Sequence, residues 1–191
     1  DVLAYLRVVL TIAESEPRSL ADRGSSSDVP QFLRDPALAG DLARIIGVPP
    51  RGIGKATILK LIGDKPVPPS AMRRLEVFAG ELRELALVAR NEKPSETLRR
   101  IIEEMGIAAH LADGTEEGEE REANVRELVS LALKYEALEP LEGLERLLED
   151  AALASDQDAL EGAKSAVRLM TVHAAKGLEF DHVFITGLEQ G

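Results

Sequence analysis

Apolar residues recur at spacings of three and four over most of the chain, a period that is typical of amphipathic helices. This spacing predicts helices over residues 2–13, 41–46, 55–62, 70–90, 94–105, 123–138 and 141–153. Ser70 is the expected N-cap of the longest helix, while Pro94 and Gly106 are expected to open and close the next one. The pattern therefore predicts a mainly helical unit.

Three polar stretches interrupt the helical pattern. Residues 14–39 begin with a run rich in Ser, Asp, Pro and Gly, which predicts a flexible loop. Residues 113–122 contain mostly acids and Gly and are predicted to form an acidic surface turn, and residues 155–162 are predicted to be a polar linker.

The pattern changes near the end of the chain. Residues 167–172 and 182–186 are apolar or alternating and rich in branched side chains, which predicts two short β-strands around a glycine-containing turn. Two strands alone bury too little surface to be stable. We therefore expect a helical domain over residues 1–166 and, over residues 167–191, a piece of a sheet whose other strands lie outside this chain.

A glycine-rich turn lies between the second and third predicted helices, over residues 47–57. Gly52 and Gly54 flank Ile53, so the backbone on either side can approach another surface closely while Ile53 anchors the turn in the core. Gly54 lies at the amino end of a predicted helix, where unpaired N–H groups can bind an anion. Arg51 and Lys55 add positive charge and Thr57 adds a hydroxyl, so a nucleic-acid phosphate is the natural ligand.

Two other interpretations of this turn are available. The glycines can serve only as caps in an ordinary helix-turn-helix corner, and the turn residues alone do not exclude this. The pair Gly54-Lys55 also resembles the end of a nucleotide-binding P-loop, but Pro49 stands where the first glycine is needed and Ala56 where a metal-binding hydroxyl is needed. The P-loop interpretation therefore fails at two positions.

The charge distribution decides whether a nucleic-acid partner is reasonable. The 191 residues carry a net charge of -11, which by itself disfavours phosphate binding. Residues 41–60, however, have four bases against one acid, a local charge of +3, whereas residues 113–150 have 4 bases against 13 acids, a local charge of -9. This distribution allows a small basic site on an acidic body.

Composition excludes several other classes of protein. There is no cysteine, which removes disulfides and thiolate metal sites. No apolar run approaches the roughly 20 residues needed to cross a bilayer, and the amino end lacks the features of a signal peptide. We therefore expect no membrane association and a cytoplasmic location.

The second candidate site is the segment over residues 169–180, which reads LMTVHAAKGLEF. It places Thr171, His173, Lys176 and Glu179 in a strand-to-turn segment, a position that often carries function. Taken singly, each of these residues is as readily explained by a structural role in the turn.

Taken together, the string resembles the T-x-H-x-x-K-G-L-E-F motif of UvrD/Rep/PcrA-type superfamily 1 DNA helicases, with matches at Thr171, His173, Lys176, Gly177, Leu178, Glu179 and Phe180. Three more segments resemble that family in the same order along the chain: residues 1–7, the P-x-R-G-I-G element within residues 48–54, and the R-x-x-N-[VIL]-x-E-L helix at residues 121–128.

The resemblance implies a fold and a role for each candidate residue. Residues 1–166 would be the helical accessory subdomain, called 2B, and residues 167–191 a piece of the second RecA-like α/β motor domain, called 2A. The glycine turn would contact duplex DNA through Arg51, Gly52, Ile53, Gly54, Lys55 and Thr57. Thr171 and His173 would contact single-stranded DNA, Lys176 would position the motif, and Gly177 and Glu179 would bind the nucleotide.

The function implied is that of an excised piece of an ATP-dependent 3'–5' DNA helicase of the bacterial, nucleoid-associated type, which contacts the duplex and regulates unwinding. ATP and Mg²⁺ are the expected cofactors of the whole enzyme. The family's phosphate loop, acidic metal motif and arginine finger are absent from these 191 residues, so we expect the chain alone to bind neither cofactor and to hydrolyse no ATP.

Several alternatives stay open at this point. The acidic helices over residues 121–150 can form a protein-interaction module of a repair factor and dock a repair or transcription protein. The chain can also be the equivalent region of a helicase-nuclease subunit. The segment from residue 12 to residue 39 looks enlarged relative to the family, and the unpaired strands allow either a monomer or a strand-exchanged dimer.

Overall fold

The computed structural model describes residues 1–15, 30–161 and 182–184, with side chains described up to residue 153 and again at 182–184. The chain divides into two compact units, Asp1–Leu153 and Ala154–Gly191. Residues 167–172, the first predicted strand, and the motif at 169–180 lie outside the described residues. Residues 182–184 of the second predicted strand have no regular secondary structure.

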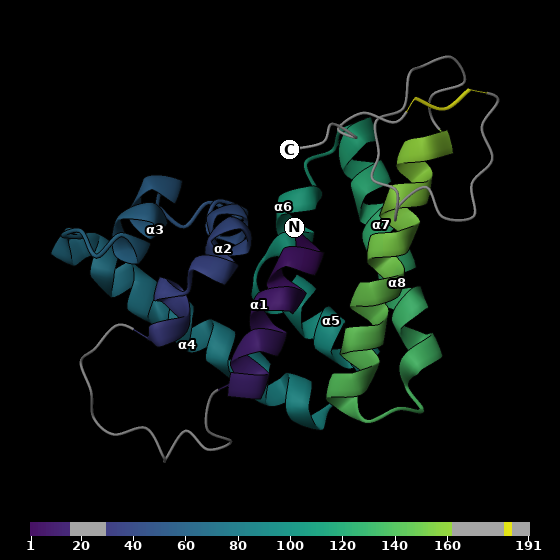
Figure 1. The fold of residues 1–191 in the computed structure, drawn as a ribbon, viewed down its shortest axis with the longest axis horizontal. Coiled ribbons are helices and arrows are strands. Elements are labelled where there is room, and N and C mark those ends of the chain that lie inside the picture. Colours follow the sequence, from purple (N-terminus) through teal and green to yellow (C-terminus); the bar gives the residue numbers. More distant parts are fainter. Residues whose placement is uncertain (16–29, 162–181, 185–191) are drawn as a thin grey trace, which may run out of the picture. The chain divides into compact units, whose positions relative to one another are not determined.

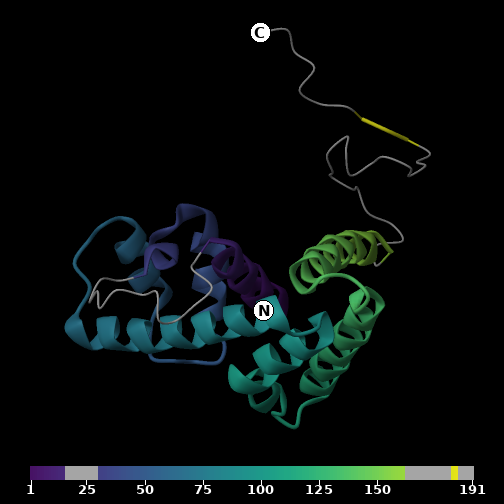
Figure 2. The ribbon, with the colours of Figure 1, turned by 90° about the horizontal axis from the view of Figure 1, so that it is seen from below.

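Helix α1 (Val2–Ser15) is the centre of the first unit. It packs against α2 (Ala39–Ile45), α4 (Pro69–Asn91) and α5 (Pro94–Glu104) (Figures 1 and 2). Its apolar residues are buried on nearly every side rather than on one face, as expected for a helix that is surrounded by others. The helix predicted over residues 2–13 is confirmed, and its central position explains why it has so few polar residues.

Residues 30–38 form two short 3-10 helices, η2 (Gln31–Arg34) and η3 (Pro36–Leu38). Phe32, Leu33 and Leu38 are buried in the core. The prediction of a flexible loop is therefore wrong for residues 30–38, because burial of three apolar side chains fixes this segment against the core.

The long helix α4 and the helix α5 follow the predicted boundaries closely. The expected N-cap is wrong, because Pro68 caps α4 and Pro69 is its first residue, so that Ser70 lies in the first turn with its side chain exposed. A proline is well suited to this first position, where its missing N–H would have no partner. Gly106 has a φ of +72°, the left-handed conformation that lets glycine end α5 and lead into α6 (Ile107–Leu111).

The acidic segment is helical for most of its length. Helix α7 (Glu116–Ala132) begins inside the stretch predicted as a turn, because the Thr115 hydroxyl accepts a 3.0 Å hydrogen bond from the Gly118 N–H. Three glutamates in the first turn favour the same start, since they lie at the positive end of the helix dipole. The helix is followed by η4 (Leu133–Tyr135).

Helix α8 (Pro140–Glu161) runs through most of the predicted polar linker, so the prediction of a linker at residues 155–161 is also wrong. Leu144 and Leu147 of α8 join the core of the first unit. Within the described ranges, no helix is both long enough and apolar enough to span a bilayer.

Candidate nucleic-acid interface

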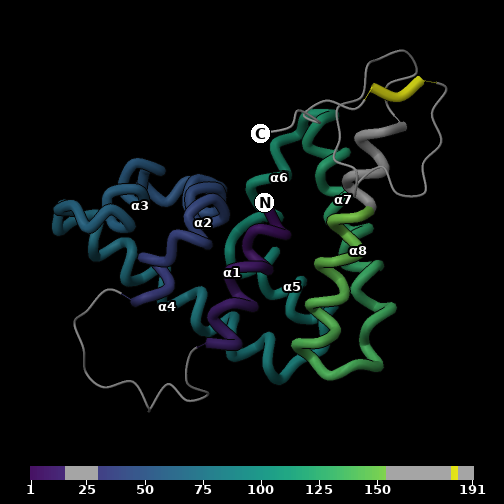
Figure 3. The backbone as a smooth tube through the Cα atoms, viewed as in Figure 1, coloured from purple at the N-terminus to yellow at the C-terminus, as the bar shows by residue number. Residues whose placement is uncertain are grey.

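The glycine-rich turn joins α2 to α3 (Lys55–Ile62) and can be followed along the backbone in Figure 3. Gly52 is exposed and has a φ of +65°, a conformation that side chains rarely tolerate. Gly54 is exposed as well and is the N-cap residue of α3. Ile53 between them is only 6% exposed, so its side chain anchors the turn while both glycines face outward.

The space in front of Gly54 is open. A Cβ atom added at Gly54 would meet no heavy atom of the described residues within 4 Å, whereas one added at Gly52 would lie 3.2 Å from Nη1 of Arg74. The first N–H groups of α3 lie at this exposed end, and Gly54 has no side chain that could cap them. The Thr57 N–H already has a partner within the protein, since it donates to the Gly54 carbonyl oxygen at 2.8 Å. The backbone can therefore present N–H donors to an anion here.

Arg51 does not present its charge to a ligand, contrary to expectation. Its guanidinium points inward and donates to the carbonyl oxygens of Ile45 at 3.3 Å, Pro49 at 3.0 Å and Met105 at 2.8 Å. It also lies over the rings of Phe78 and Tyr5, at 5.0 Å and 5.7 Å from their centroids. Three carbonyl groups and two aromatic faces satisfy this cation within the protein, so Arg51 holds the turn in place.

Tyr5 supports the same turn from α1. Its hydroxyl lies 3.0 Å from the carbonyl oxygens of both Ile45 and Val48, which share its single hydrogen. Burial raises the pKa of Tyr5 to about 12, and this effect outweighs the positive charge of Arg51, which acts in the opposite direction. The hydroxyl is therefore a permanent donor near neutral pH.

Lys55 and Thr57 lie where the sequence places them, on the first turn of α3. The Lys55 side chain is exposed and forms no ion pair within the part of the chain that the structure describes. Thr57 is half-buried. Of the two cations expected at the turn, Lys55 is thus the one that faces solvent.

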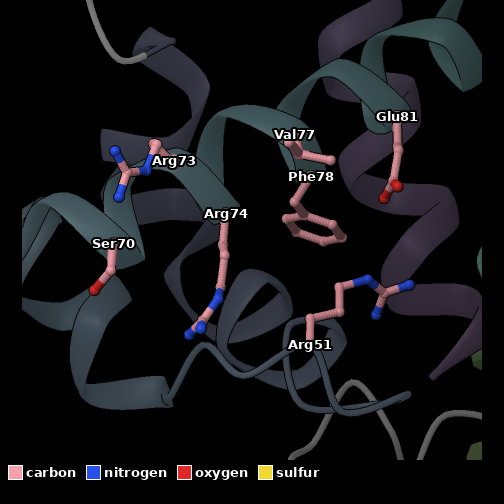
Figure 4. Close-up of a pocket in the computed structure, with 7 residues that line it drawn as sticks. All are labelled: Arg51, Ser70, Arg73, Arg74, Val77, Phe78 and Glu81. Atoms are coloured by element: carbon pink, nitrogen blue, oxygen red, sulfur yellow. The ribbon is translucent and has the colours of Figure 1, made fainter.

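Sequence reasoning missed a second set of cations, which α4 places beside the turn. Nη1 of Arg74 donates to the Gly52 carbonyl oxygen at 2.8 Å. A cleft next to this contact is lined by side chains from the turn and from α4, shown in Figure 4: Arg51, Ser70, Arg73, Arg74, Val77, Phe78 and Glu81. The lining residues from α4 recur at intervals of three and four, which places them on one face of that helix. This spacing could have identified them in the sequence, but the apolar residues of the same helix were taken as its only pattern.

The second candidate site cannot be placed. Thr171, His173, Lys176, Gly177 and Glu179 all lie outside the described residues, so their expected roles stay predictions. Among the residues that are described, no cluster of acids and histidines is arranged to hold a metal ion.

Helix α7 presents a separate, acidic surface. Most of its residues are exposed, including six glutamates: Glu116, Glu117, Glu119, Glu120, Glu122 and Glu127. Such a surface repels phosphate. Protein docking on α7 stays a prediction.

Comparisons with known proteins agree with the sequence motifs. The chain is similar to the ATP-dependent DNA helicase PcrA of Bacillus subtilis, with 29% identity over 202 residues that cover 89% of this chain and 27% of the relative. DNA helicase II of Escherichia coli is 29% identical over 195 residues, again 89% of this chain and 27% of the relative. PcrA of Staphylococcus aureus strain Mu50 is 31% identical over 196 residues, 88% of this chain and 26% of the relative.

The chain thus spans about a quarter of the length of these curated relatives. No solved structure matches it. The model of the UvrD-like helicase C-terminal domain matches residues 70–191, which include α4 and the motif at 169–180. Because this match covers more than half of its residues, the chain belongs to the UvrD-like helicase C-terminal domain family.

Proposed function

We propose that this chain is the duplex-contacting accessory region of an ATP-dependent DNA helicase that moves 3' to 5' and that it regulates unwinding. Membership of the UvrD-like family supports the helicase class, and the relatives are named as DNA helicases. The observation that carries the DNA contact is the exposure of Gly52, Gly54 and Lys55 at the amino end of α3, which no side chain caps.

The contact proposed is with the sugar-phosphate backbone. N–H groups at the start of α3 would donate to a phosphate oxygen, and the exposed Lys55 ammonium would supply the charge. Thr57 would add a hydroxyl donor. Arg51 and the buried Ile53 act behind this surface, fixing the position of the turn. Because no base edge is read by such contacts, binding is independent of DNA sequence.

The remaining parts of the proposal concern the whole helicase. Thr171 and His173 would contact single-stranded DNA, Lys176 would position that motif, and Gly177 and Glu179 would face the ATP nucleotide. ATP and Mg²⁺ would be held mainly by motifs that these 191 residues lack, so the chain by itself would not hydrolyse ATP.

The test is a binding measurement with the 191-residue chain and a short fluorescent DNA duplex, alongside a single strand of the same sequence. We expect weak binding with a preference for the duplex. Lys55→Ala should reduce the slope of log affinity against log salt concentration by the amount that corresponds to roughly one phosphate contact. Arg146→Ala is the matched control, since Arg146 is an exposed arginine on α8 that pairs with Glu149. Equal affinity and equal salt dependence in wild type and Lys55→Ala would overturn the proposal.

A further inference from the structure

The cleft beside the turn has a volume of about 490 Å³ and opens along one face of α4. The lining residues from α4 follow the spacing of three and four that places side chains on one face of a helix. They are Ser70, Arg73, Arg74, Val77, Phe78 and Glu81. Figure 4 shows Arg51 of the turn on the opposite wall, beside Phe78. The cleft thus lies between the turn and a helix, with Arg73 and Arg74 at one end and Arg51 beside Phe78 and Glu81 at the other.

This region concentrates positive charge in an otherwise acidic chain. Residues 51–74 contain six bases and one acid, a local charge of +5, against -11 for the whole chain. The single acid, Asp64, is paired with Arg34 at 2.8 Å. The region's own acid therefore does not neutralise the cations near the cleft.

The cleft residues retain donors for a ligand. Arg74 uses Nη1 for the Gly52 carbonyl oxygen, but a guanidinium has five N–H donors. Arg73 is exposed and forms no ion pair within the described ranges, and the exposed Ser70 adds a hydroxyl in the first turn of α4. Glu81 lies at the other end of the cleft, where its charge would repel an anion. An anion is therefore directed to the end formed by Ser70, Arg73 and Arg74.

We propose that this end of the cleft is a second backbone-phosphate site, formed by Ser70, Arg73 and Arg74. It deepens the proposed function and rests on it, because the hydrogen bond from Arg74 to Gly52 joins the cleft directly to the turn. One duplex then contacts both the amino end of α3 and the first turns of α4. Arg73 supplies charge, Arg74 both charge and the link to the turn, and Ser70 a neutral donor.

The experiment compares Arg73→Ala, Lys55→Ala and the double variant in duplex binding by the 191-residue chain over a range of salt concentrations. Arg73 is the residue to change because Arg74 also supports the turn. We expect Arg73→Ala to reduce the slope of log affinity against log salt by roughly one, and the double variant by roughly two. Arg73→Lys should keep the wild-type slope, and Arg146→Ala again serves as the control.

The possible results separate the two proposals. If Lys55→Ala lowers the slope and Arg73→Ala does not, the cleft site is wrong and the proposed function stands. If neither variant changes the slope, both are wrong. An arm that measures the binding of inorganic phosphate alone, at constant ionic strength, identifies the ligand. Phosphate binding that is lost in Arg73→Ala without any change in duplex binding would assign the cleft to a free anion and overturn the proposal.

Discussion

Arg51 donates a hydrogen bond of 2.8 Å to the carbonyl oxygen of Met105, a residue 54 positions further along the chain. This contact joins the turn between α2 and α3 to the end of α5. Because the same guanidinium also bonds to Ile45 and Pro49, one side chain ties the end of α2 and the first part of the turn to the end of α5. The exposed glycines are held in place from behind by a cation whose hydrogen bonds go to the protein's own carbonyl groups.

Replacing Arg51 with Ala should therefore reduce stability as well as DNA binding. Loss of several hydrogen bonds from a charged donor should lower the free energy of unfolding by about 2–4 kcal/mol. Arg51→Lys should recover only part of the loss, since an ammonium cannot reproduce the planar fork of a guanidinium. Urea unfolding followed by circular dichroism measures both variants, and wild-type stability in Arg51→Ala would show that these contacts do not hold the turn.

Tyr5→Phe removes a buried donor that serves two carbonyl groups. We expect a loss of about 1–3 kcal/mol in the free energy of unfolding near neutral pH, because the acceptors of Ile45 and Val48 stay partly buried without a partner.

The pH dependence provides an independent check of the same residue. The folded protein raises the pKa of Tyr5 from 10.0 to about 12, so the neutral hydroxyl is favoured by folding. The stabilisation is fully present below pH 10 and is lost as the pH rises through about 12. Unfolding titrations across this window should converge for wild type and Tyr5→Phe, and a constant difference between them would contradict the assignment.

Two glycines of the turn should respond differently to alanine. Gly52→Ala forces a side chain into a left-handed conformation 3.2 Å from Arg74, which should cost about 1–2 kcal/mol of stability. Gly54→Ala meets no neighbour and should cost no more than about 0.5 kcal/mol, yet its methyl group would stand in front of the α3 amino end. Gly54→Ala should therefore bind duplex more weakly while remaining folded. Unchanged duplex affinity in a folded Gly54→Ala protein would argue against close approach at this point.

The packing of α8 depends on a third glycine. A Cβ atom at Gly143 would lie 2.7 Å from Cγ of Pro94 and 2.9 Å from the carbonyl oxygen of Tyr135. Gly143→Ala should lower the unfolding free energy by about 1–3 kcal/mol through overpacking. Gly80→Ala is the matched control inside α4, where no described residue lies within 4 Å of the added Cβ atom and alanine should stabilise the helix by about 0.5–1 kcal/mol. Equal unfolding midpoints for the two variants would contradict this packing.

The sequence predicted elements well where the apolar period was strong. Helix α3 begins and ends at the predicted residues 55 and 62, because Gly54 and Gly63 bound a short amphipathic run. The prediction was wrong where a polar composition was interpreted as a loop, as in the acidic turn predicted over residues 113–122. Helix α7 begins there, because the glutamates that follow the Thr115 cap favour the start of a helix. Local composition does not reveal a long-range partner, and the inward direction of Arg51 depends on carbonyl groups as far along the chain as Met105.

The most direct test of the central claim is to add a DNA duplex to the isotope-labelled 191-residue chain and to follow its backbone amide signals by NMR. We predict that the amides of Gly52, Gly54, Lys55 and Ala56 shift with increasing duplex, while those of the acidic helix α7 do not. Saturable duplex binding that leaves the turn amides unmoved, or that shifts mainly α7, would contradict the account.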